Sequence, residues 1–386
     1  MKEIQQIINA YEFAKANEIA CVLATVVHVD GSSYRRAGAR MLVDMYGQMT
    51  GAISGGCLEG DALNKALFAL QVAENKLVSY DTSDESDAVI GVQLGCNGII
   101  QVLFEPIHFE NPANPVELLK KAKNIATESI ITTFFNLKRS EKQIGTSVVF
   151  GNNGLSLLGQ ITLPDLEKVI QKDVAEAYES KASQFRAYIS ADKIHNAFHA
   201  YNAITPKLIL IGAGNDAQIL ASMADTLGWE IHIADGRHTH ATSDRFMPSC
   251  SVKVSKPESV LDVVEISEHT YFVLMSHNYN YDLAVLRAII QTGKNPYVGI
   301  LGPKVKYDRM LGELNEQGIV PKPEQLAAIH APVGLDIGAE TSSEIALSIL
   351  AEIQQFKTKS LGQPLKEKSG PIHAKKDNEF KTIVIS

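Results

Sequence analysis

The sequence predicts an α/β protein, with a Rossmann-like parallel sheet in its C-terminal part and an α+β domain before it. Three observations predict this. Apolar strands alternate with helices after residue 205, a glycine-rich turn joins the first of these strands to a helix, and the first half is richer in strand-like segments. We expect domains at 1–204 and 205–357, with a weaker pattern in 107–204 and a mostly loose tail at 358–386.

Composition and charge narrow the class of protein. The 386 residues are 45% hydrophobic and carry 44 acidic against 36 basic side chains, a net charge of −8. A chain of this sign has no general attraction to nucleic acid or to anionic membranes. Its start lacks the apolar run of a signal peptide, and no stretch approaches the roughly 18 apolar residues of a spanning helix. We therefore expect a cytoplasmic protein.

The four cysteines are Cys21, Cys57, Cys96 and Cys250, and no two of them form a CxxC pair. In a reducing compartment disulfides are not expected. The spacing also gives no structural zinc site built from cysteine.

The first domain opens with an amphipathic helix at 3–20, whose apolar residues recur at helical spacing. A strand at 21–29, a loop at 31–40 and a hairpin that turns near Gly47 follow. A helix is expected within 55–76. The remaining pattern indicates strands at 77–82, 98–107, 129–138 and 146–151, and helices at 115–126 and 165–182.

The alternation of strands and helices in the second domain predicts βαβ units. The last helix is expected at 342–356, with Thr341 or Ser342 as its N-cap and Glu344 in its first turn. A further strand is possible at 382–385. Strands are expected at 206–211, 229–235, 270–276 and 296–302, and earlier helices at 215–227, 282–293 and 306–318.

The turn GAGNDA, residues 212–217, directly follows the apolar strand LILI and opens a helix. It fits the GxGxx(G/A) fingerprint, in which Gly212 permits a tight turn and Gly214 lets the backbone approach a pyrophosphate. Asn215 then stands at the helix N-terminus, where free N–H groups favour a phosphate. The sequence therefore predicts a Rossmann fold and a cofactor site at this turn; the alternative is that the glycines only form the turn.

Asp235 ends the next strand, near the distance expected of an acid that binds a ribose hydroxyl. Arg237 follows it closely. Two hypotheses for Arg237 stay open. In the first, Arg237 binds the 2′-phosphate of a cofactor; in the second, it only pairs with a solvated Asp235.

SGGCLEG, residues 54–60, places Gly55 and Gly56 before a helix, with Cys57 expected in the first helical turn. The positive end of the helix dipole favours a thiolate there, and a thiolate is both a nucleophile and a soft metal ligand. Cys57 is therefore a candidate cofactor and molybdenum contact. The alternative is a small residue at a helix cap. GCNG, residues 95–98, places a second cysteine in a tight turn.

GSSYRRAGARM carries Arg35, Arg36 and Arg40 among small residues. Three guanidiniums in one short loop can grip a phosphate. The alternative is a solvated basic loop paired with surface acids.

His277 and Asn278 follow the expected strand at 270–276. In open α/β sheets, ligands bind at the carboxyl ends of the strands, so this pair is a candidate ligand contact. Asp282 either orients His277 or is a first-turn acid at the start of a helix.

Several motifs together resemble one known family. GSSYRRAGARMLV, GAISGGCLEGD and GCNGIIQVLFEP are similar to the N-terminal signature of the xanthine dehydrogenase accessory factors, the XdhC/CoxI family. LILIGAGNDAQILASMADTLGWEIHIADGR, MSHNYNYDLAVL, YVGILGPKVKYDRML and HAPVGLDIGAETSSEIALSILAEI resemble that family's Rossmann domain. The resemblance covers roughly residues 10–107 and 205–356, in the same order.

The resemblance implies a chaperone that binds molybdenum cofactor, protects it during sulfuration and hands it to apo-xanthine dehydrogenase or a related molybdenum hydroxylase. It implies a sulfurtransferase as a further partner, and a homodimer suits a carrier that exposes its cargo. The alternatives are an NAD(P)-dependent oxidoreductase that uses the turn at 212–217, and an interaction protein whose Rossmann domain binds nothing. Four scattered cysteines cannot supply the iron–sulfur clusters of a molybdenum hydroxylase itself.

Ligand pockets favour domain interfaces. We therefore expect the loops at 31–40 and 54–60 to face the carboxyl edge of the parallel sheet, within one chain or across a dimer.

Overall fold

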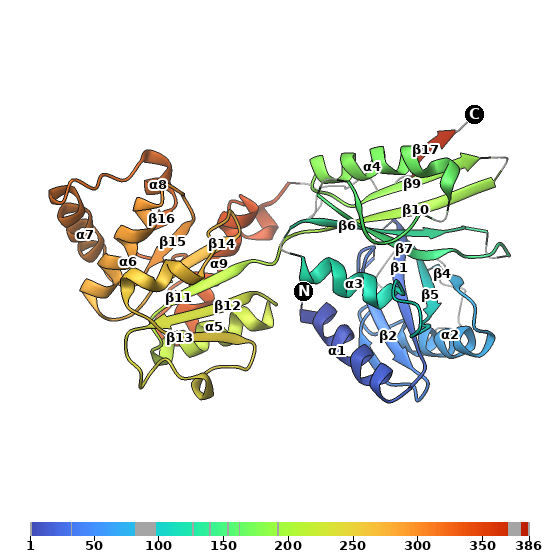
Figure 1. Cartoon of the computed structure of the whole chain (residues 1–386), viewed down its shortest axis with the longest axis horizontal. Helices are drawn as coiled ribbons and strands as arrows, with labels where there is room; N and C mark the ends of the chain where they lie inside the picture. Colours follow the sequence, from blue (N-terminus) through green and yellow to red (C-terminus); the bar gives the residue numbers. More distant parts are fainter. Residues whose placement is uncertain are drawn as a thin grey trace. The chain divides into compact units, whose positions relative to one another are not determined.

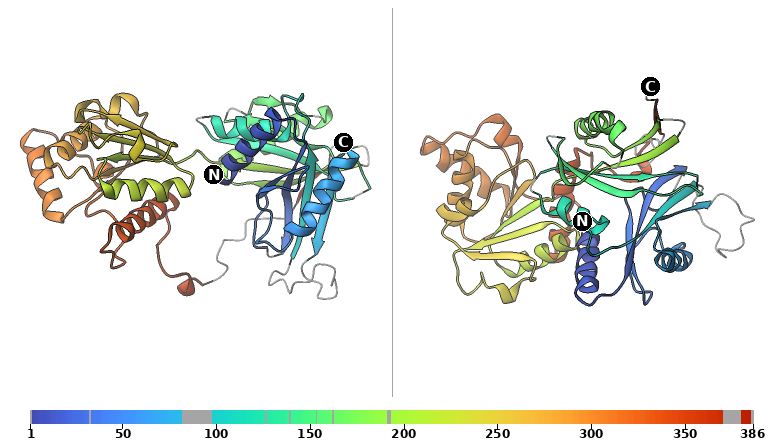
Figure 2. Two further views of the ribbon diagram at one scale, coloured as in Figure 1. Left: turned by 90° about the horizontal axis from the view of Figure 1, so that it is seen from below. Right: turned by 45° about the vertical axis from the view of Figure 1, so that its right-hand side comes forward.

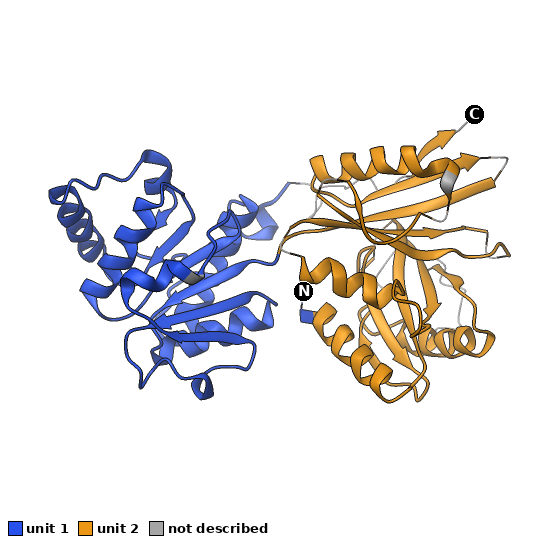
Figure 3. Cartoon of the chain, in the orientation of Figure 1, with its two compact units in different colours: residues 1–2, 205–372 blue, residues 3–204, 373–386 orange. Residues whose placement is uncertain are grey.

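The computed structural model describes residues 2–31, 33–81, 98–125, 127–138, 140–152, 154–161, 163–190, 193–369 and 380–384. The chain divides into two units, one of residues 3–204 with 373–386 and the other of residues 1–2 with 205–372 (Figure 3). Cys96 of the GCNG turn lies outside the described residues.

The first unit contains two sheets that face each other. Sheet A has the order β3-β2-β1-β5-β4 and is antiparallel throughout. Successive side chains of its strands point to opposite faces of the sheet. Apolar side chains on one face pack against α2, and those on the other face pack against the second sheet. Its strands are β1 (Cys21–Gly31), β2 (Arg40–Asp44), β3 (Met49–Gly51), β4 (Lys76–Asp81) and β5 (Gly98–Pro106).

Sheet B has the order β17-β9-β10-β6-β7-β8. Only its last strand in the chain, β17, pairs parallel, on the outer edge of β9. Helix α4 covers the face of sheet B that points away from sheet A (Figures 1 and 2). The strands are β6 (Ser129–Phe135), β7 (Gly145–Gly151), β8 (Ser156–Gly159), β9 (Gln184–Ser190), β10 (Lys193–Asn202) and β17 (Lys381–Val384).

Among the residues that the structure describes, four α-helices complete the first unit. Apolar residues of α1 and α3 join the core between the two sheets, because both helices carry an apolar face at helical spacing. Asn114 caps α3 by accepting from the N–H groups of Val116 and Glu117. The helices are α1 (Lys2–Ala16), α2 (Glu59–Val72), α3 (Pro115–Asn124) and α4 (Glu167–Glu179).

The second unit is a doubly wound α/β domain. Sheet C is wholly parallel, with the order β13-β12-β11-β14-β15-β16, which is the dinucleotide-binding order 3-2-1-4-5-6. Helices α5 and α9 pack on one face, and α6 and α7 on the other. The strands are β11 (Lys207–Ile211), β12 (Glu230–Asp235), β13 (Cys250–Val254), β14 (Thr270–Leu274), β15 (Tyr297–Ile300) and β16 (Ile329–His330).

The α/β prediction and the C-terminal parallel sheet are confirmed. The helices here are α5 (Asn215–Thr226), α6 (Tyr279–Gln291), α7 (Lys304–Glu316), α8 (Pro323–Ala327) and α9 (Ser342–Thr358). Of the two residues expected as the N-cap of α9, the structure has Thr341, which forms a capping box with Glu344 in the first turn. Among the described helices, none combines the length and the apolar character required to cross a bilayer.

Several elements differ from the sequence prediction, and β8, β13, α8 and β16 were not predicted. The first helix ends at Ala16 rather than near residue 20, and α2 begins at Glu59 rather than near residue 55. The hairpin of β9 and β10 was not predicted, although its alternating pattern is visible in the sequence. The C-terminal strand expected near 382–385 forms at Lys381–Val384.

Candidate functional site

The glycine-rich turn joins β11 to α5 and packs against the end of β14. Gly212 has a φ of +118°, and a Cβ there would lie 2.6 Å from the Met275 carbonyl oxygen. Only glycine fits this position. Gly214 is the N-cap of α5, and a Cβ there would meet only the His277 ring, at 3.8 Å. The backbone at Gly214 is thus open to an approaching group, which is the geometry an anion at a helix N-terminus requires.

The Asp235 carboxylate is already engaged by its own chain. Its side chain is 2% exposed and accepts from the Ala213 N–H at 2.7 Å and from the Arg237 guanidinium at 2.6 and 3.0 Å. Burial alone would raise the pKa of Asp235, but these hydrogen bonds lower it below its usual value. The sequence left two hypotheses for Arg237 open, and in the structure Arg237 pairs with Asp235. Asp235 is nevertheless buried, so it is not the solvated strand end that this hypothesis assumed.

Arg245 also binds the glycine-rich turn, although the sequence did not point to it. Its Nη1 donates to the Ala213 carbonyl at 2.8 Å and its Nη2 donates to Asn215 Oδ1 at 3.0 Å. Arg245 ends a short 3₁₀ helix after β12, so no local sequence signal links it to the turn. Its guanidinium adds positive charge beside the N-terminus of α5, where a phosphate would be favoured.

His277 lies at the carboxyl end of β14 and faces the turn. Its backbone is in the left-handed region, with a φ of +56°, which is uncommon for a residue with a side chain. Its Nε2 lies 3.6 Å from Asp216 Oδ2 in the first turn of α5, and its side chain is 60% exposed. The structure therefore brings Gly214, Asp216 and His277 together at the sheet edge where sequence reasoning placed a site.

Asn278 and Asp282 have structural partners. The Asn278 side chain caps α6 by accepting from the Tyr281 N–H. Asp282 is fully buried and accepts from Ser276 Oγ at 2.5 Å and from Lys306 Nζ at 2.7 Å. Asp282 therefore positions the strand end through Ser276 and Lys306, and the suggestion that it orients His277 is wrong.

The SGGC turn of the first unit is organised by Ser54. Its hydroxyl accepts from the N–H groups of Gly56 and Leu58 and donates to the carboxylate of Glu59. Cys57 lies in this turn, before the first residue of α2 and not in the first helical turn as expected. Its side chain is exposed. A Cβ at Gly56 would meet nothing within 4 Å, so the turn offers an accessible thiol beside open backbone.

Tyr34 brings the second motif of this unit beside the first. A Cβ at Gly55 would lie 3.1 Å from the Tyr34 ring, so the ring rests on the backbone of the SGGC turn. Tyr34 belongs to the loop at 31–40, which we call the Tyr34 loop. The three arginines of this loop have different surroundings. Arg36 is exposed, and Arg35 pairs with Glu3 at 3.1 Å.

Arg40 does not join the other two arginines. It begins β2 opposite Thr25, and only 5% of it is exposed. Its Nη1 donates to the Gly38 carbonyl, and the charge of Glu105 acts on its guanidinium. The prediction of one loop with three phosphate-gripping arginines therefore fails for Arg40, because strand alternation turns its side chain between the sheets.

Among the described residues, no group of three or more His, Cys, Asp and Glu side chains is arranged to hold a metal ion. Cys21 is buried, which raises the pKa of its thiol to about 12, and Cys250 is partly buried with a raised pKa from the same cause. The expected joint site of the two units stays a prediction.

Comparison with known families gives two matches along the chain. The model of the XdhC and CoxI family matches residues 14–81, and that of the XdhC Rossmann domain matches residues 208–353. The first contains the Tyr34 loop and the SGGC turn. The second contains the glycine-rich turn and His277.

Relatives match over most of the chain. A protein of Bacillus subtilis described as a probable subunit of xanthine dehydrogenase is 29% identical over 86% of this chain and 92% of its own length. The molybdenum cofactor insertion chaperone PaoD of Escherichia coli is 25% identical over 86% of this chain and 82% of its own. A crystal structure named as a xanthine dehydrogenase from Bacillus halodurans has a TM-score of 0.69 at 25% identity, covering 93% of this chain and 98% of that one.

Proposed function

Because the chain belongs to the XdhC and CoxI family, we propose that it is a maturation factor that binds molybdenum cofactor and delivers it to a molybdenum hydroxylase of the xanthine dehydrogenase type. The observation that carries the proposal is the match to the molybdenum cofactor insertion chaperone, which extends through both units of this chain. The Bacillus subtilis relative bears the name of a probable xanthine dehydrogenase component, which supports the kind of partner.

The Rossmann turn suits the phosphate end of the cargo. The open backbone of Gly214, the N-terminus of α5 and the guanidinium of Arg245 place N–H donors and positive charge at one point. His277 stands beside them and is exposed enough to contact a ligand. The carboxylate oxygens of Asp235 already accept hydrogen bonds from Ala213 and Arg237. We therefore assign Asp235 the role of fixing the turn and not that of binding a ribose.

The SGGC turn suits the metal end of the cargo. Cys57 is exposed, lies among glycines and has Arg36 and Tyr34 on the neighbouring loop. A thiolate is a soft ligand, as a molybdenum dithiolene centre requires. An exposed thiol can also release its ligand to a partner enzyme, which a carrier must do at the end of its cycle.

Two finer parts of the proposal concern partners. We propose that a sulfurtransferase acts on the bound cargo and that the carrier is a homodimer. Light scattering on the purified protein tests the second part: a mass twice the 42.0 kDa of one chain supports it, and a single-chain mass rejects it.

The test of the cargo uses full-length protein from a host that makes molybdenum cofactor. Molybdenum analysis and pterin fluorescence should show the cofactor in the wild type and less of it in Cys57→Ser. Cys250→Ser, at a partly accessible thiol, is the matched control and should retain the wild-type level. The loaded protein should then activate an apo-xanthine dehydrogenase. Failure to retain molybdenum and pterin, or failure to activate the apo-enzyme, would reject the proposal.

The alternative function is an NAD(P)-dependent oxidoreductase. The glycine-rich turn is the feature that suggests it, but Arg237 already occupies the acid that such an enzyme needs for a ribose. Nucleotide oxidation by the purified chain with a small substrate, and without molybdenum cofactor, would favour this alternative.

A further inference from the structure

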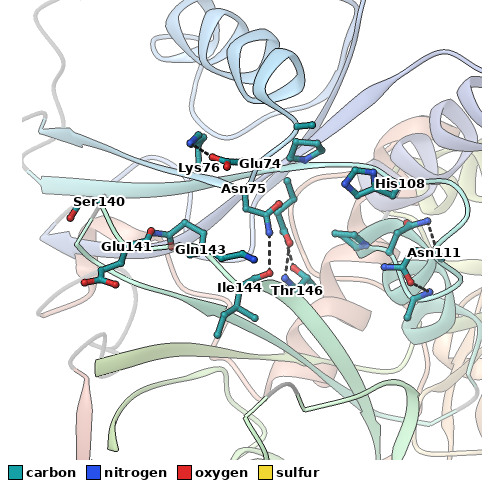
Figure 4. Close-up of a pocket in the computed structure, with 17 residues that line it drawn as sticks. Glu74, Asn75, Lys76, His108, Asn111, Ser140, Glu141, Gln143, Ile144 and Thr146 are labelled. Atoms are coloured by element: carbon teal, nitrogen blue, oxygen red, sulfur yellow. Dashed lines mark hydrogen bonds and ion pairs between the residues drawn. The ribbon is translucent and has the colours of Figure 1, made fainter. Parts of the chain in front are cut away.

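A pocket of about 620 Å³ lies in the first unit, between the turn from α2 to β4, the end of β5, the turn before α3 and the loop from β6 to β7 (Figure 4). Its central polar groups bind one another. Asn75 Nδ2 donates to the Ile144 carbonyl at 2.9 Å. The carboxyl group of Glu105 is 1% exposed and accepts from the N–H and the hydroxyl of Thr146 at 2.6 and 2.9 Å. We therefore assign this pocket no ligand.

Two helices of the second unit begin at the same point, and a carboxylate lies between them. Helices α5 and α9 pack on one face of sheet C. Ser342, the first residue of α9, donates from its hydroxyl to Asp216 Oδ1 at 2.6 Å, and Asp216 belongs to the first turn of α5. Because the N-terminus of a helix carries roughly half a positive charge, two positive helix ends meet at the Asp216 carboxylate.

Other groups at this point also favour an anion. His277 Nε2 lies 3.6 Å from Asp216 Oδ2, and Arg245 Nη2 donates at 3.0 Å to the side chain of Asn215, the residue before Asp216. Gly214, the N-cap of α5, has no side chain with which to accept from the N–H groups of the first turn. The chain therefore supplies its own anion at this positive end, the carboxylate of Asp216.

The Asp216 carboxylate is accessible from the side on which a ligand approaches. The side chains of Asp216 and His277 are 35% and 60% exposed, and a Cβ at Gly214 would meet only the His277 ring. Gly214 and Asp216 are two residues apart, within one helical turn of about 5.4 Å. A phosphate at the open backbone of Gly214 therefore lies close to the carboxylate, and the two negative charges repel each other.

We propose that Asp216 is an internal competitor of the phosphate that binds at the glycine-rich turn. Its carboxylate neutralises the two helix ends in the ligand-free protein and lowers the affinity of the turn for phosphate. This role rests on the proposed function, since it regulates the site assigned to the phosphate end of the cargo. A carrier has to release what it binds, and a permanent negative charge beside the phosphate limits how tightly the phosphate is held.

Calorimetric titration of the full-length, cofactor-free protein with pyrophosphate tests this role. Asp216→Asn keeps an oxygen that can accept from Ser342 but removes the charge, so the variant should bind pyrophosphate about tenfold more tightly than the wild type. Glu316→Gln is the matched control, because it removes the same charge from an exposed residue at the far end of α7. We expect the control to bind as the wild type does.

Three results of this titration would overturn the proposal. They are equal or weaker binding by Asp216→Asn, a gain of the same size in Glu316→Gln, and the absence of pyrophosphate binding in the wild type and in Asp216→Asn alike. The double variant Asp216→Asn with Arg245→Ala locates the binding. It should lose at least about tenfold in affinity relative to Asp216→Asn, and an unchanged affinity would place pyrophosphate away from the turn and reject the proposal.

The stability of the ligand-free protein separates competition from a purely structural role. The Asp216 carboxylate stabilises two helix ends, so Asp216→Asn should lower the melting temperature of the ligand-free protein by about 2 °C. The affinity for pyrophosphate should rise in the same variant. A residue that only holds the turn together would lose stability and affinity together, and that result would contradict the proposal.

The test of the cargo gives a separate result. Failure of the wild type to retain molybdenum and pterin would reject the proposed function, but the pyrophosphate affinities of the wild type and Asp216→Asn could still be compared. Conversely, Asp216→Asn with unchanged pyrophosphate affinity would reject the competition, whereas the retention of molybdenum and pterin by the wild type would be unaffected.

Discussion

The accessibility of single thiols is the most direct feature to test at the scale of the residue. Cys57 is exposed in the SGGC turn, Cys250 is partly buried and Cys21 is fully buried. Burial disfavours the thiolate of the last two. We therefore expect timed alkylation, followed by mass spectrometry, to label Cys57 first and Cys21 last. Labelling of Cys250 before Cys57 would contradict this order.

Glu105 predicts a pH-dependent stability. Its folded pKa of about 7 lies above its usual value of 4.5, so its contribution to stability is fully present below pH 4.5 and is lost as the pH rises through 7. Burial raises the pKa of Glu105, and it prevails over the hydrogen bonds from Thr146 and the charge of Arg40, which act to lower it. The change in wild-type stability between pH 5.5 and pH 8 from this group is about 2 kcal/mol.

Glu105→Gln removes that titration. Relative to the wild type, the variant should therefore gain about 2 kcal/mol between pH 5.5 and pH 8, as measured by urea unfolding at both values. A difference between the two proteins that does not change with pH would show that Glu105 does not titrate in this range.

At the scale of the element, the two glycines of the turn after β11 have different roles. Gly212→Ala should lower the free energy of unfolding by about 2 kcal/mol, because a Cβ would collide with the Met275 carbonyl at a positive φ. Gly214→Ala should change it by less than about 0.5 kcal/mol, since only the exposed His277 ring is near. Thermal unfolding of both variants checks the contrast, and equal destabilisation would argue against it.

The turn could be predicted because its signal is local. Strand, glycines, helix and terminal acid follow one another within 207–235, and the structure has them in that order. The N-cap of α9 was predictable for the same reason. The strand β2 was also expected, but the burial of Arg40 was not, because it depends on pairing with Thr25 and on Glu105 two strands away.

The remaining features depend on contacts between distant segments. The pocket that Glu105 lines is formed by four segments between residues 73 and 146, and among them only the end of β5 lies within a motif, GCNGIIQVLFEP. Arg245 reaches the turn only through the fold of the second unit. The hairpin of β9 and β10 has a readable alternation, but alternation alone, in a region without turn or motif signals, does not fix a hairpin.

At the scale of the whole molecule, each unit has its own core. The apolar clusters on the two faces of sheet C contain only residues of the second unit, and those around sheets A and B only residues of the first. Residues 205–369 expressed alone should therefore unfold in one cooperative transition, as measured by circular dichroism. A non-cooperative melt would contradict the independence of this core.

Residues 1–204 alone lack one part of their unit. Phe380, just before β17, stacks on His28 at 4.5 Å between ring centroids and lies 5.9 Å from Phe185. Phe380→Ala in the full chain should lower the stability of the first unit by about 2 kcal/mol. Val384→Ala, at a position that is 72% exposed, is the matched control and should have little effect. Equal effects of both changes would show that the aromatic contact is not formed.

The position of β17 also bears on synthesis. In the part of the chain that the structure describes, the other strands of sheet B are complete at Asn202, whereas its edge along β9 is covered much later, by residues 381–384. A nascent chain on the ribosome therefore carries an open sheet edge until residues 381–384 have been synthesised, and such edges are sites of wrong pairing between neighbouring chains. A product that stops before residue 380 keeps that edge permanently, so quality control by proteases should recognise such a product more readily than copies that contain β17.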